Sequence, residues 1–336
     1  MFKDIDDARA VIQEIAVDDA ETPMTDAQVQ LLLDRLIRQL WLTPSERSVE
    51  TFGATRLGGA PDLPKGTAWP LRPIPPDAAE RAEEMKQSFE WIASHIVREL
   101  PFEFLAQIDL AEAASYPDHA HGLPPEGRLL FFWDGVVGLH TSGPAACRVL
   151  WDASPVEALE RLAIPALLAE LEAAYDPSGK FKKPYVYPAR ALQLAPIVHL
   201  PDRHSADFQA DPALQQLGDH EDHEESYALL TALDDGQFTT AGRGARRQRV
   251  LGSPNPEQDD PRFDTIVADG FPPPRWDAHQ LAEASRRALE WQLLLQLDLG
   301  DLSQQALTEG TVYFLIRKRD LAKRDFSAVH AVYQQT

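Results

Sequence analysis

Two Gln-x-Asp motifs are the polar groups whose types and spacing recur along the chain. Gln107 and Asp109 form the first motif, and Gln296 and Asp298 form the second. If the four side chains lined a shared groove, two neighbouring carboxylates would raise one another's pKa and could hold a proton, a metal ion or a polar ligand. The other interpretation is structural, because an aspartate at the end of a strand can accept backbone N–H bonds and fix the turn that follows. We favour the structural role and keep the four as candidate ligand or groove residues.

Histidines among acidic side chains are the next candidates. GDHEDHEES places His220 and His223 three positions apart, so they could share a helical face and bind zinc. Zinc ligands are normally fixed by further hydrogen bonds that a solvated acidic turn does not supply. We therefore predict no tightly bound metal and no cofactor. His119 and His121, beside Asp118, receive the same interpretation.

Arg243, Arg246, Arg247 and Arg249 form the one concentrated basic cluster of the sequence. Guanidinium groups match the geometry of carboxylate and phosphate, so the cluster could bind an anion. The alternative, which we favour, is that it neutralises acidic side chains on its own surface. Exposed ion pairs of that kind contribute only about 0–1 kcal/mol.

No serine or cysteine has the surroundings of a catalytic nucleophile. The sequence contains no GxSxG motif, and Ser142 lies in HTSGP without a turn signature that would activate its hydroxyl. Cys147 lies in an apolar segment, where a cysteine is usually a buried, unreactive thiol. Residues 51–70 are too rich in glycine and proline for a regular element. We predict an ordered loop there, because Trp69 gives it a large side chain to bury, and Trp69 is kept among the groove candidates.

Strands must position the two Gln-x-Asp motifs. In Phe104–Leu110 the even-numbered residues share one apolar face, and the odd-numbered residues, including Gln107 and Asp109, share the other. In Leu293–Leu299 the odd-numbered leucines share one face. Each stretch is therefore predicted to be a half-buried strand.

Three features recur in the same order, which predicts an internal duplication. The first strand, with its Gln-x-Asp motif, recurs as the second, and GRLLFF, beginning at Gly127, recurs as GTVYFL, beginning at Gly310. LGGAP, ending at Pro61, is echoed by LGSP, ending at Pro254. We expect one half at about 51–155 and a second at about 185–336, within one domain spanning 51–336.

Helices are predicted around these halves. Apolar residues recur at helical spacing from the N-terminus to Val17, and a second helix begins at the capping box of Thr25 and Gln28, with an apolar stripe running to Leu40. This helical pair is expected to form an N-terminal extension, residues 1–50.

Further amphipathic helices are predicted at 75–100 and 156–175, and short strands at 135–140 and 146–151. Consecutive strands with short turns favour antiparallel pairing. The fold class is therefore α+β, with internally duplicated, mainly antiparallel halves and peripheral helices.

The charge balance bears on the partner. With 32 Lys and Arg against 53 Asp and Glu among 336 residues, the formal net charge is −21. Such a chain would repel the phosphates of nucleic acid, so nucleic acid is not the expected partner. The charge indicates either a basic protein partner or a role in solubility alone. A hydrophobic content of 44% is ample for a sizeable core.

Cellular location is predicted from what the sequence lacks. The single cysteine, Cys147, excludes an internal disulfide and fits a reducing compartment. No apolar run approaches the roughly 20 residues of a membrane-spanning helix. MFKDIDDARA has acids where a signal peptide needs positive charge. A soluble cytoplasmic protein that binds no membrane is expected.

Several separated segments carry a family resemblance in the same order. They are RLGGAPDLPKGTAWP, PFEFLAQIDL, LPPEGRLLFFWD, RVLGSPNPEQDDPR, WQLLLQLDLGD and EGTVYFLIRKRDLAKRDFSAV. From about Thr51 onward the chain resembles the YwqG-like family, a bacterial family carried as domain of unknown function 1963. The resemblance implies an α+β fold with duplicated β-rich halves and brings no established activity or catalytic residues.

The chain departs from the family's pattern at two places. It has Gln248 and Ser253 where relatives tend to carry histidine, and SQQALTEG stands where relatives carry Trp-Gly-Asp before the last glycine strand. A site built from those positions in relatives is therefore in doubt here.

Two classes of function follow. We favour a binding or interaction protein without catalysis, whose acidity suits a cationic partner, such as a basic toxin or nuclease that it would inhibit. The alternative is a hydrolase that uses carboxylates or a metal in a groove between the two halves. A deep pocket lined by buried, convergent acids or histidines would favour catalysis.

Overall fold

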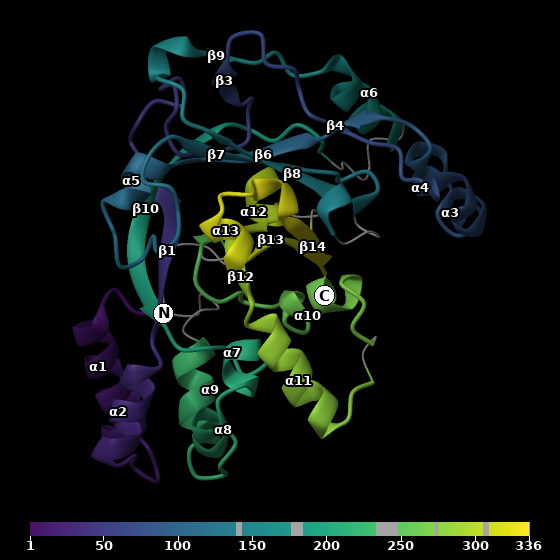
Figure 1. The fold of residues 1–336 in the computed structure, drawn as a ribbon. Coiled ribbons are helices and arrows are strands. Elements are labelled where there is room, and N and C mark those ends of the chain that lie inside the picture. The colour runs from purple at the N-terminus through teal and green to yellow at the C-terminus, as the bar shows by residue number, and fades with distance from the viewer. Residues whose placement is uncertain (139–142, 176–183, 233–247, 273–274, 305–308, 336) are drawn as a thin grey trace.

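One large sheet forms the centre of the fold. The computed structural model describes residues 1–336 except 139–142, 176–183, 233–247, 273–274, 305–308 and 336 (Figure 1). In the described part, the sheet has the order β14-β13-β12-β11-β1-β10-β2-β6-β7-β8, and its neighbouring strands are antiparallel. Its strands are β1 (Ile37–Pro44), β2 (Arg56–Leu57), β6 (Glu103–Asp109), β7 (Arg128–Trp133), β8 (Cys147–Asp152), β10 (Arg190–His199), β11 (Arg249–Val250), β12 (Trp291–Asp298), β13 (Thr311–Arg317) and β14 (His330–Gln334). Two small sheets pair β3 (Asp62–Pro64) with β9 (Leu159–Arg161), and β4 (Leu71–Arg72) with β5 (Leu100–Pro101).

The sheet has the same succession of strand types on both sides of its centre. β1 and β10 lie in the middle, and on each side follow a two-residue strand and a three-stranded meander. Each central strand pairs with the flank that does not follow it directly in the chain: β1 precedes β2 but pairs with β11, whereas β10 pairs with β2. The segment expected to be an N-terminal helical extension therefore also supplies a strand, β1, to the middle of the sheet.

β-Bulges at equivalent positions change the faces predicted for β6 and β12. The register shifts between Phe104 and Ala106, and again between Leu293 and Leu295. Because a bulge inserts one extra residue, the alternation reverses there. Phe104 and Leu293 therefore pack outside the central core, which corrects the prediction that each shares a face with the residues after it.

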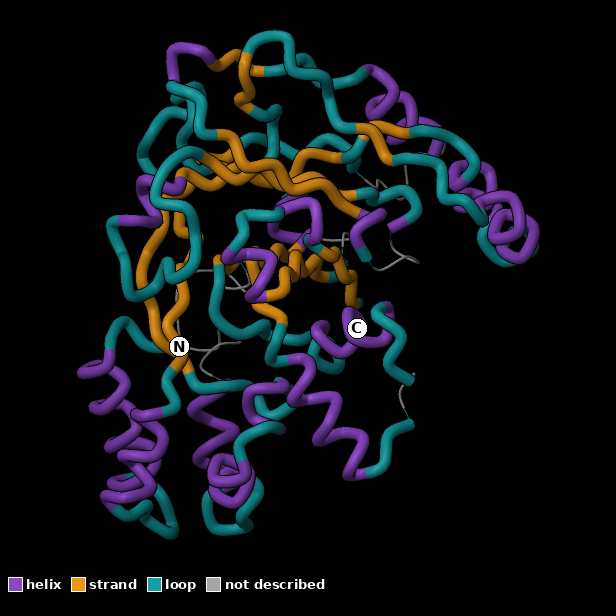
Figure 2. Tube along the Cα trace, in the orientation of Figure 1, coloured by secondary structure: helices purple, strands orange, loops and turns teal. Residues whose placement is uncertain are grey.

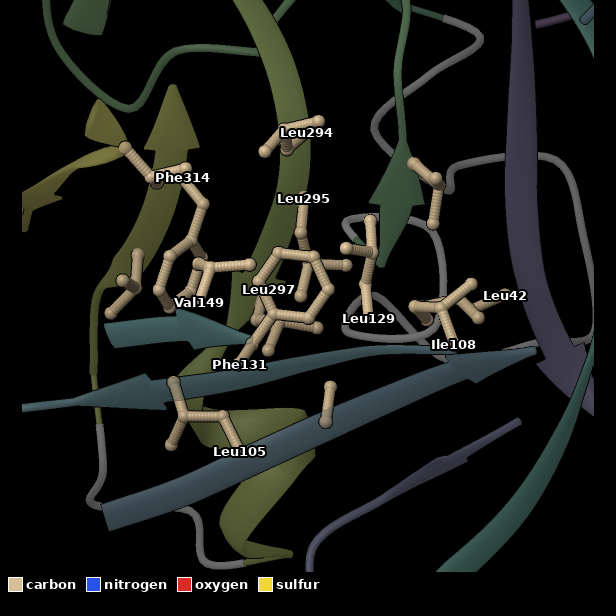
Figure 3. Close-up of a cluster of buried hydrophobic side chains, with 14 of the residues drawn as sticks. Leu42, Leu105, Ile108, Leu129, Phe131, Val149, Leu294, Leu295, Leu297 and Phe314 are labelled. Atoms are coloured by element: carbon tan, nitrogen blue, oxygen red, sulfur yellow. The ribbon is translucent and has the colours of Figure 1, made fainter. Parts of the chain in front are cut away.

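The central core lies between the two meanders. In Figure 3, Phe131 and Val149 of one flank face Leu295 and Phe314 of the other, and the rings of Phe131 and Phe314 lie 5.1 Å apart. The edges of the sheet also approach each other, since Gly143, just before β8, forms a bridge with Ala331 of β14. The two flanks thus form one body around a shared core.

Helices surround this sheet (Figure 2). The α-helices are α1 (Ile5–Gln13), α2 (Asp26–Asp34), α3 (Ala78–Met85), α4 (Glu90–Ile96), α5 (Leu110–Ala114), α6 (Ala166–Tyr175), α7 (Ala206–Gln209), α8 (Pro212–Gly218), α9 (Glu224–Ala232), α10 (Pro261–Ala268), α11 (Ala278–Ala288), α12 (Leu299–Ser303) and α13 (Lys318–Ala322). A π-helical turn, η1 (Glu14–Asp18), continues α1, and short 3-10 turns occur at η3 (Pro144–Ala146), η4 (Val156–Ala158) and η7 (Phe326–Ala328). The mixed helix and strand fold with a large antiparallel sheet agrees with the predicted class.

The predicted second helix is confirmed at its start and wrong at its end. The capping box of Thr25 and Gln28 is present, but α2 ends at Asp34 and β1 begins at Ile37. Leu40 belongs to β1, where it is buried in the central core. Burial between two strands thus outweighs the helical spacing that carried the stripe to Leu40.

Three other predicted elements are corrected. The helix expected at 75–100 is divided into α3 and α4, and the one expected at 156–175 is helical in α6, after the strand β9. Pro165 immediately precedes α6. A proline disfavours helical backbone in the residue before it, so α6 begins only after Pro165. Residues 135–138 form a turn, whose amides at Val136 and Val137 donate to the Asp134 carboxylate, and 139–140 lie outside the described residues.

Candidate functional site

Gln107 holds a loop against the outer face of β6. Its Nε2 donates to Ala54 O at 3.0 Å and to the Asp62 carboxylate at 3.2 Å, while its Oε1 accepts from Asp62 N at 3.1 Å. The side chain is fully buried. Its amide is therefore occupied by protein groups and does not face a groove.

Gln296 makes the matching contact on β12. Its Oε1 accepts from Asn255 N at 2.9 Å, and the side chain is likewise fully buried. Each glutamine is paired across the sheet with a buried arginine, Arg56 for Gln107 and Arg249 for Gln296. Arg56 is not among the candidates predicted from the sequence. The offset of 193 residues between Pro61 and Pro254 aligns Arg56 with Arg249.

Asp109 and Asp298 begin the short helices that follow their strands. Asp109 Oδ1 accepts from Ala111 N at 3.0 Å, and Asp298 Oδ1 accepts from Asp301 N at 2.8 Å. These are the backbone contacts that the structural interpretation predicts. A ligand role for the two carboxylates stays a prediction.

An ion-pair network surrounds Asp62, which is not among the candidates predicted from the sequence. Its carboxylate accepts from Arg56 at 2.9 Å, from Arg161 at 3.0 Å and from Gly53 N at 3.0 Å. Burial favours a higher pKa for Asp62, but Arg56 and the hydrogen bonds outweigh it, so the pKa lies below its usual range. Arg56 has a lowered pKa because burial penalises its charge more than Asp62 compensates.

The second flank has a different network at the matching loop. Asn255 takes the place of Asp62, and the charges lie instead on Arg262, whose guanidinium binds Asp260 and Asp207. Ser253 Oγ donates to the Asp207 carboxylate at 2.6 Å. Burial tends to lower the pKa of Arg262, but the two aspartates raise it above its ordinary value. The charged groups of this network are therefore paired with one another.

The cavities on the described surface bear on the predicted site residues. A cavity of about 490 Å³ is lined by Asp109, Glu112, Arg47 and Tyr116, among others. The Glu112 carboxylate within it accepts from Leu194 N at 2.9 Å and from Thr55 Oγ1 at 2.7 Å. Asp298 does not line this cavity, so the two Gln-x-Asp motifs do not share it.

A second cavity, of about 350 Å³, contains both histidines of the acidic segment. His220 is half exposed and His223 is buried, their rings lie 5.7 Å apart, and Gln28 of α2 contacts His223 Nε2 at 3.0 Å. Across the described ranges, no three His, Cys, Asp or Glu side chains are grouped as a metal site would require. The prediction that this segment binds no metal tightly awaits measurement.

The third cavity, of about 220 Å³, lies beside β1 and β12. Its lining includes His119, His121 and Asp118, together with Arg38 and Lys318. Burial, and then the nearby Arg38 charge, lower the pKa of His119, although Asp118 acts in the opposite direction. The two histidines noted in the sequence therefore lie among cationic side chains.

Trp69 and the arginine cluster are the remaining candidates. Trp69 is a packing residue: its Nε1 donates to Phe102 O at 2.8 Å and its ring meets Phe132 edge-on at 5.8 Å. Arg243, Arg246 and Arg247 lie outside the described residues, and Arg249, their neighbour in the sequence, is buried rather than on the surface.

Acidic side chains are concentrated on one helical lobe, which we define as residues 1–34 and 202–232. This acidic lobe contains 3 Lys and Arg and 17 Asp and Glu, so it carries −14 of the chain's net −21. α2 packs against α1 and α8, and α9 packs against α8 and η1. Fourteen of the 17 acids are exposed. The lobe lies at one end of the molecule, away from α3 and α4 (Figure 1).

Residues 55–334 match the family model described as Domain of unknown function (DUF1963). The chain belongs to this family. The DUF1963 region contains β2 through β14, whereas α1, α2 and β1 precede it. The acidic lobe thus combines one segment from within the DUF1963 region with one from before it. No curated protein matches the chain.

None of the helices in the described part of the chain is long and apolar enough to cross a bilayer. The longest of these described helices, α11, has 11 residues, about half of the roughly 20 that a span requires.

Proposed function

We propose that this chain is a binding protein whose acidic lobe docks a basic partner protein, and that it catalyses no reaction. The observation that carries the proposal is the concentration of two thirds of the net negative charge, −14 of −21, on that one lobe. A localised field of one sign steers an oppositely charged partner and fixes its orientation.

The lobe is suited to docking because its helices are held by a core of their own. Ile12, Leu32, Leu214 and Tyr227 are each at most 1% exposed and pack in one cluster. Tyr227 Oη also donates to Pro201 O at 2.8 Å. A surface fixed in this way loses little conformational freedom when a partner binds.

The partner that we propose is a basic toxin or nuclease, which this chain would neutralise in the cytoplasm as a cognate inhibitor. Such a partner has the positive surface that the lobe would recognise. The hydrolase alternative has less support. Asp109 and Asp298 are engaged by backbone amides, and burial raises the pKa of the Cys147 thiol to about 12, so this thiol stays protonated near neutral pH.

Matched charge variants test the proposal. The lobe variant Asp19→Asn, Glu21→Gln, Glu221→Gln and Glu225→Gln removes four exposed negative charges. The control variant Glu80→Gln, Glu84→Gln, Glu90→Gln and Glu99→Gln removes four exposed charges around α3 and α4. Both change the net charge from −21 to −17.

The readout is the basic protein that each immobilised chain retains from a lysate of the native cells. We expect the wild type and the control variant to retain the same basic protein at low salt, and the lobe variant to retain about tenfold less of it. Equal retention by all three chains would contradict docking on the lobe.

We also propose that the two flanks arose by duplication, with β1 and β10 exchanged. Three matched details support this: the bulges in β6 and β12, the glutamine contacts to Asp62 and Asn255, and the aspartates that begin α5 and α12. Superposition of β2, β6, β7 and β8 on β11, β12, β13 and β14 in an experimental structure tests it, and different strand directions would refute it.

A further inference from the structure

A small cavity beside the sheet has a charge opposite to that of the chain as a whole. Its walls come from the start of β1, the loop after α5, the loop after β11 and the start of α13. The volume of about 220 Å³ would hold about seven water molecules at roughly 30 Å³ each. It therefore suits a small molecule or ion, below the roughly 300 Å³ of drug-sized sites.

The charges around this cavity do not cancel. Arg38 and Lys318 are both exposed, and neither forms an ion pair with any residue in the described part of the chain. Arg262 also lines the cavity, but its guanidinium is held by Asp207 and by Asp260. The described lining therefore has three cationic side chains, Arg38, Arg262 and Lys318, against two acidic ones, together with two histidines. In a chain with 53 acids and 32 basic residues, this excess of positive charge at one cavity is unexpected.

The fold holds the walls of this cavity close to one another. The loop that carries His121 packs on α13, because a Cβ at Gly122 would lie 3.1 Å from Leu321. Arg38 is paired with Val198 in the middle of the sheet. Ser253, a buried residue of the lining, is held by its bond to Asp207. Cationic groups from separate segments are thus placed before a ligand arrives, which lowers the cost of binding one.

We propose that this cavity binds a small anion through its carboxylate or phosphate groups. Arg38 and Lys318 supply the charge, and the imidazoles of His119 and His121 supply N–H donors. The same cations argue against a metal at Asp118, His119 and His121, because they would repel a divalent cation. Asp207 belongs to the acidic lobe, whereas the histidines, Arg38 and Lys318 lie outside it. The anion would therefore be a second ligand of this chain, beside the proposed partner protein.

Titration calorimetry of the full chain with sodium phosphate, and separately with sodium malonate, tests the site. The variant Arg38→Gln with Lys318→Gln removes the two cations. Its matched control is Lys65→Gln with Arg98→Gln, two exposed cations elsewhere that change the net charge equally. Thermal unfolding of each variant reports whether the fold is kept.

We expect wild type and control to bind at least one of the two probes with one site per chain. We expect the Arg38 and Lys318 variant to bind that probe with an affinity lower by about tenfold or more. Binding of phosphate alone would assign a phosphorylated ligand, and binding of malonate alone a carboxylate. Absence of binding to both probes, or equal affinity in the two double variants, would overturn the proposal. Since neither double variant alters the acidic lobe, failure here is distinguishable from failure of partner docking.

Discussion

Gln107 Oε1 accepts a hydrogen bond from the backbone N–H of Asp62 at 3.1 Å. Gln296, at the matching position of the second flank, accepts one from Asn255 N–H at 2.9 Å. Both glutamines are fully buried, and each ties the loop after a two-residue strand to the strand beside it. The recurrence of glutamine therefore has a structural cause in each flank.

Replacing Gln107 with Met is expected to lower the free energy of unfolding by about 2–4 kcal/mol. The change leaves the buried Asp62 N–H and the partly buried Ala54 carbonyl without their partner, and an unsatisfied buried group costs about 1–3 kcal/mol. Gln296→Met should cost less, because Gln296 Nε2 has no hydrogen-bond partner among the described residues. Urea unfolding measures both. A larger loss for Gln296→Met than for Gln107→Met would contradict the account.

Replacing Asp109 or Asp298 with Ala is expected to lower stability by about 1 kcal/mol, the usual effect of losing a residue that caps a helix. Asn at either position should have little effect, because its side-chain oxygen also accepts from the backbone. Thermal unfolding of the four variants tests this. If Asn and Ala were equally destabilising, the carboxylate charge rather than the cap would be responsible.

Much of the fold could be predicted from local signals, and the failures have identifiable causes. The capping box at Thr25 and the strands around Gln107 and Gln296 follow from side chains close in sequence. The end of α2 was misplaced because Leu40 fits both a helical stripe and a buried strand. A bulge leaves no clear mark in an apolar run such as LLLQL, so the face of Leu293 could not be read from alternation.

The cavity proposed to bind an anion could not be predicted from the sequence. Arg38, His119 and Lys318 are far apart in the chain, and the pairing of β1 with β11 helps to bring their segments together. The histidines were noted for possible metal binding because their cationic neighbours could not be known. The Asp62 network was missed for the same reason, since Arg161 reaches it from β9.

Asp62→Asn is expected to lower the free energy of unfolding at pH 7 by about 3–5 kcal/mol, because it leaves Arg56 buried without its counter-ion. The control Glu83→Gln, which breaks an exposed pair with Lys86, should cost less than about 1 kcal/mol. Equal effects in the two variants would show that the buried pair is not a principal stabilising contact.

The ion pairs of Asp62 predict that the free energy of unfolding depends on pH in the acid range. The pKa of Asp62 is lower in the folded than in the unfolded chain, so its stabilisation is complete above about pH 4 and is lost as the pH falls further. The difference in stability between wild type and Asp62→Asn should therefore shrink below about pH 4. A constant difference down to pH 2 would contradict the pairing.

His330 is expected to give a second dependence at higher pH. Burial, and then Arg317, lower its pKa to about 4, against about 6.5 in the unfolded chain. Between these values the unfolded chain binds the extra proton, so stability falls as the pH falls from about 6.5 to 4. In His330→Phe the slope in this window should decrease by at most about 1.4 kcal/mol per pH unit. An unchanged slope would show that His330 does not titrate in this way.

The most direct test of the proposed function is hydrogen–deuterium exchange of the chain with and without the basic protein that it retains. Docking on the acidic lobe predicts slower exchange in α1, α2, α8 and α9, with α3 and α4 unchanged. The protection should weaken as salt increases, because exposed charges are screened. Protection on another surface with none on the lobe would contradict the account.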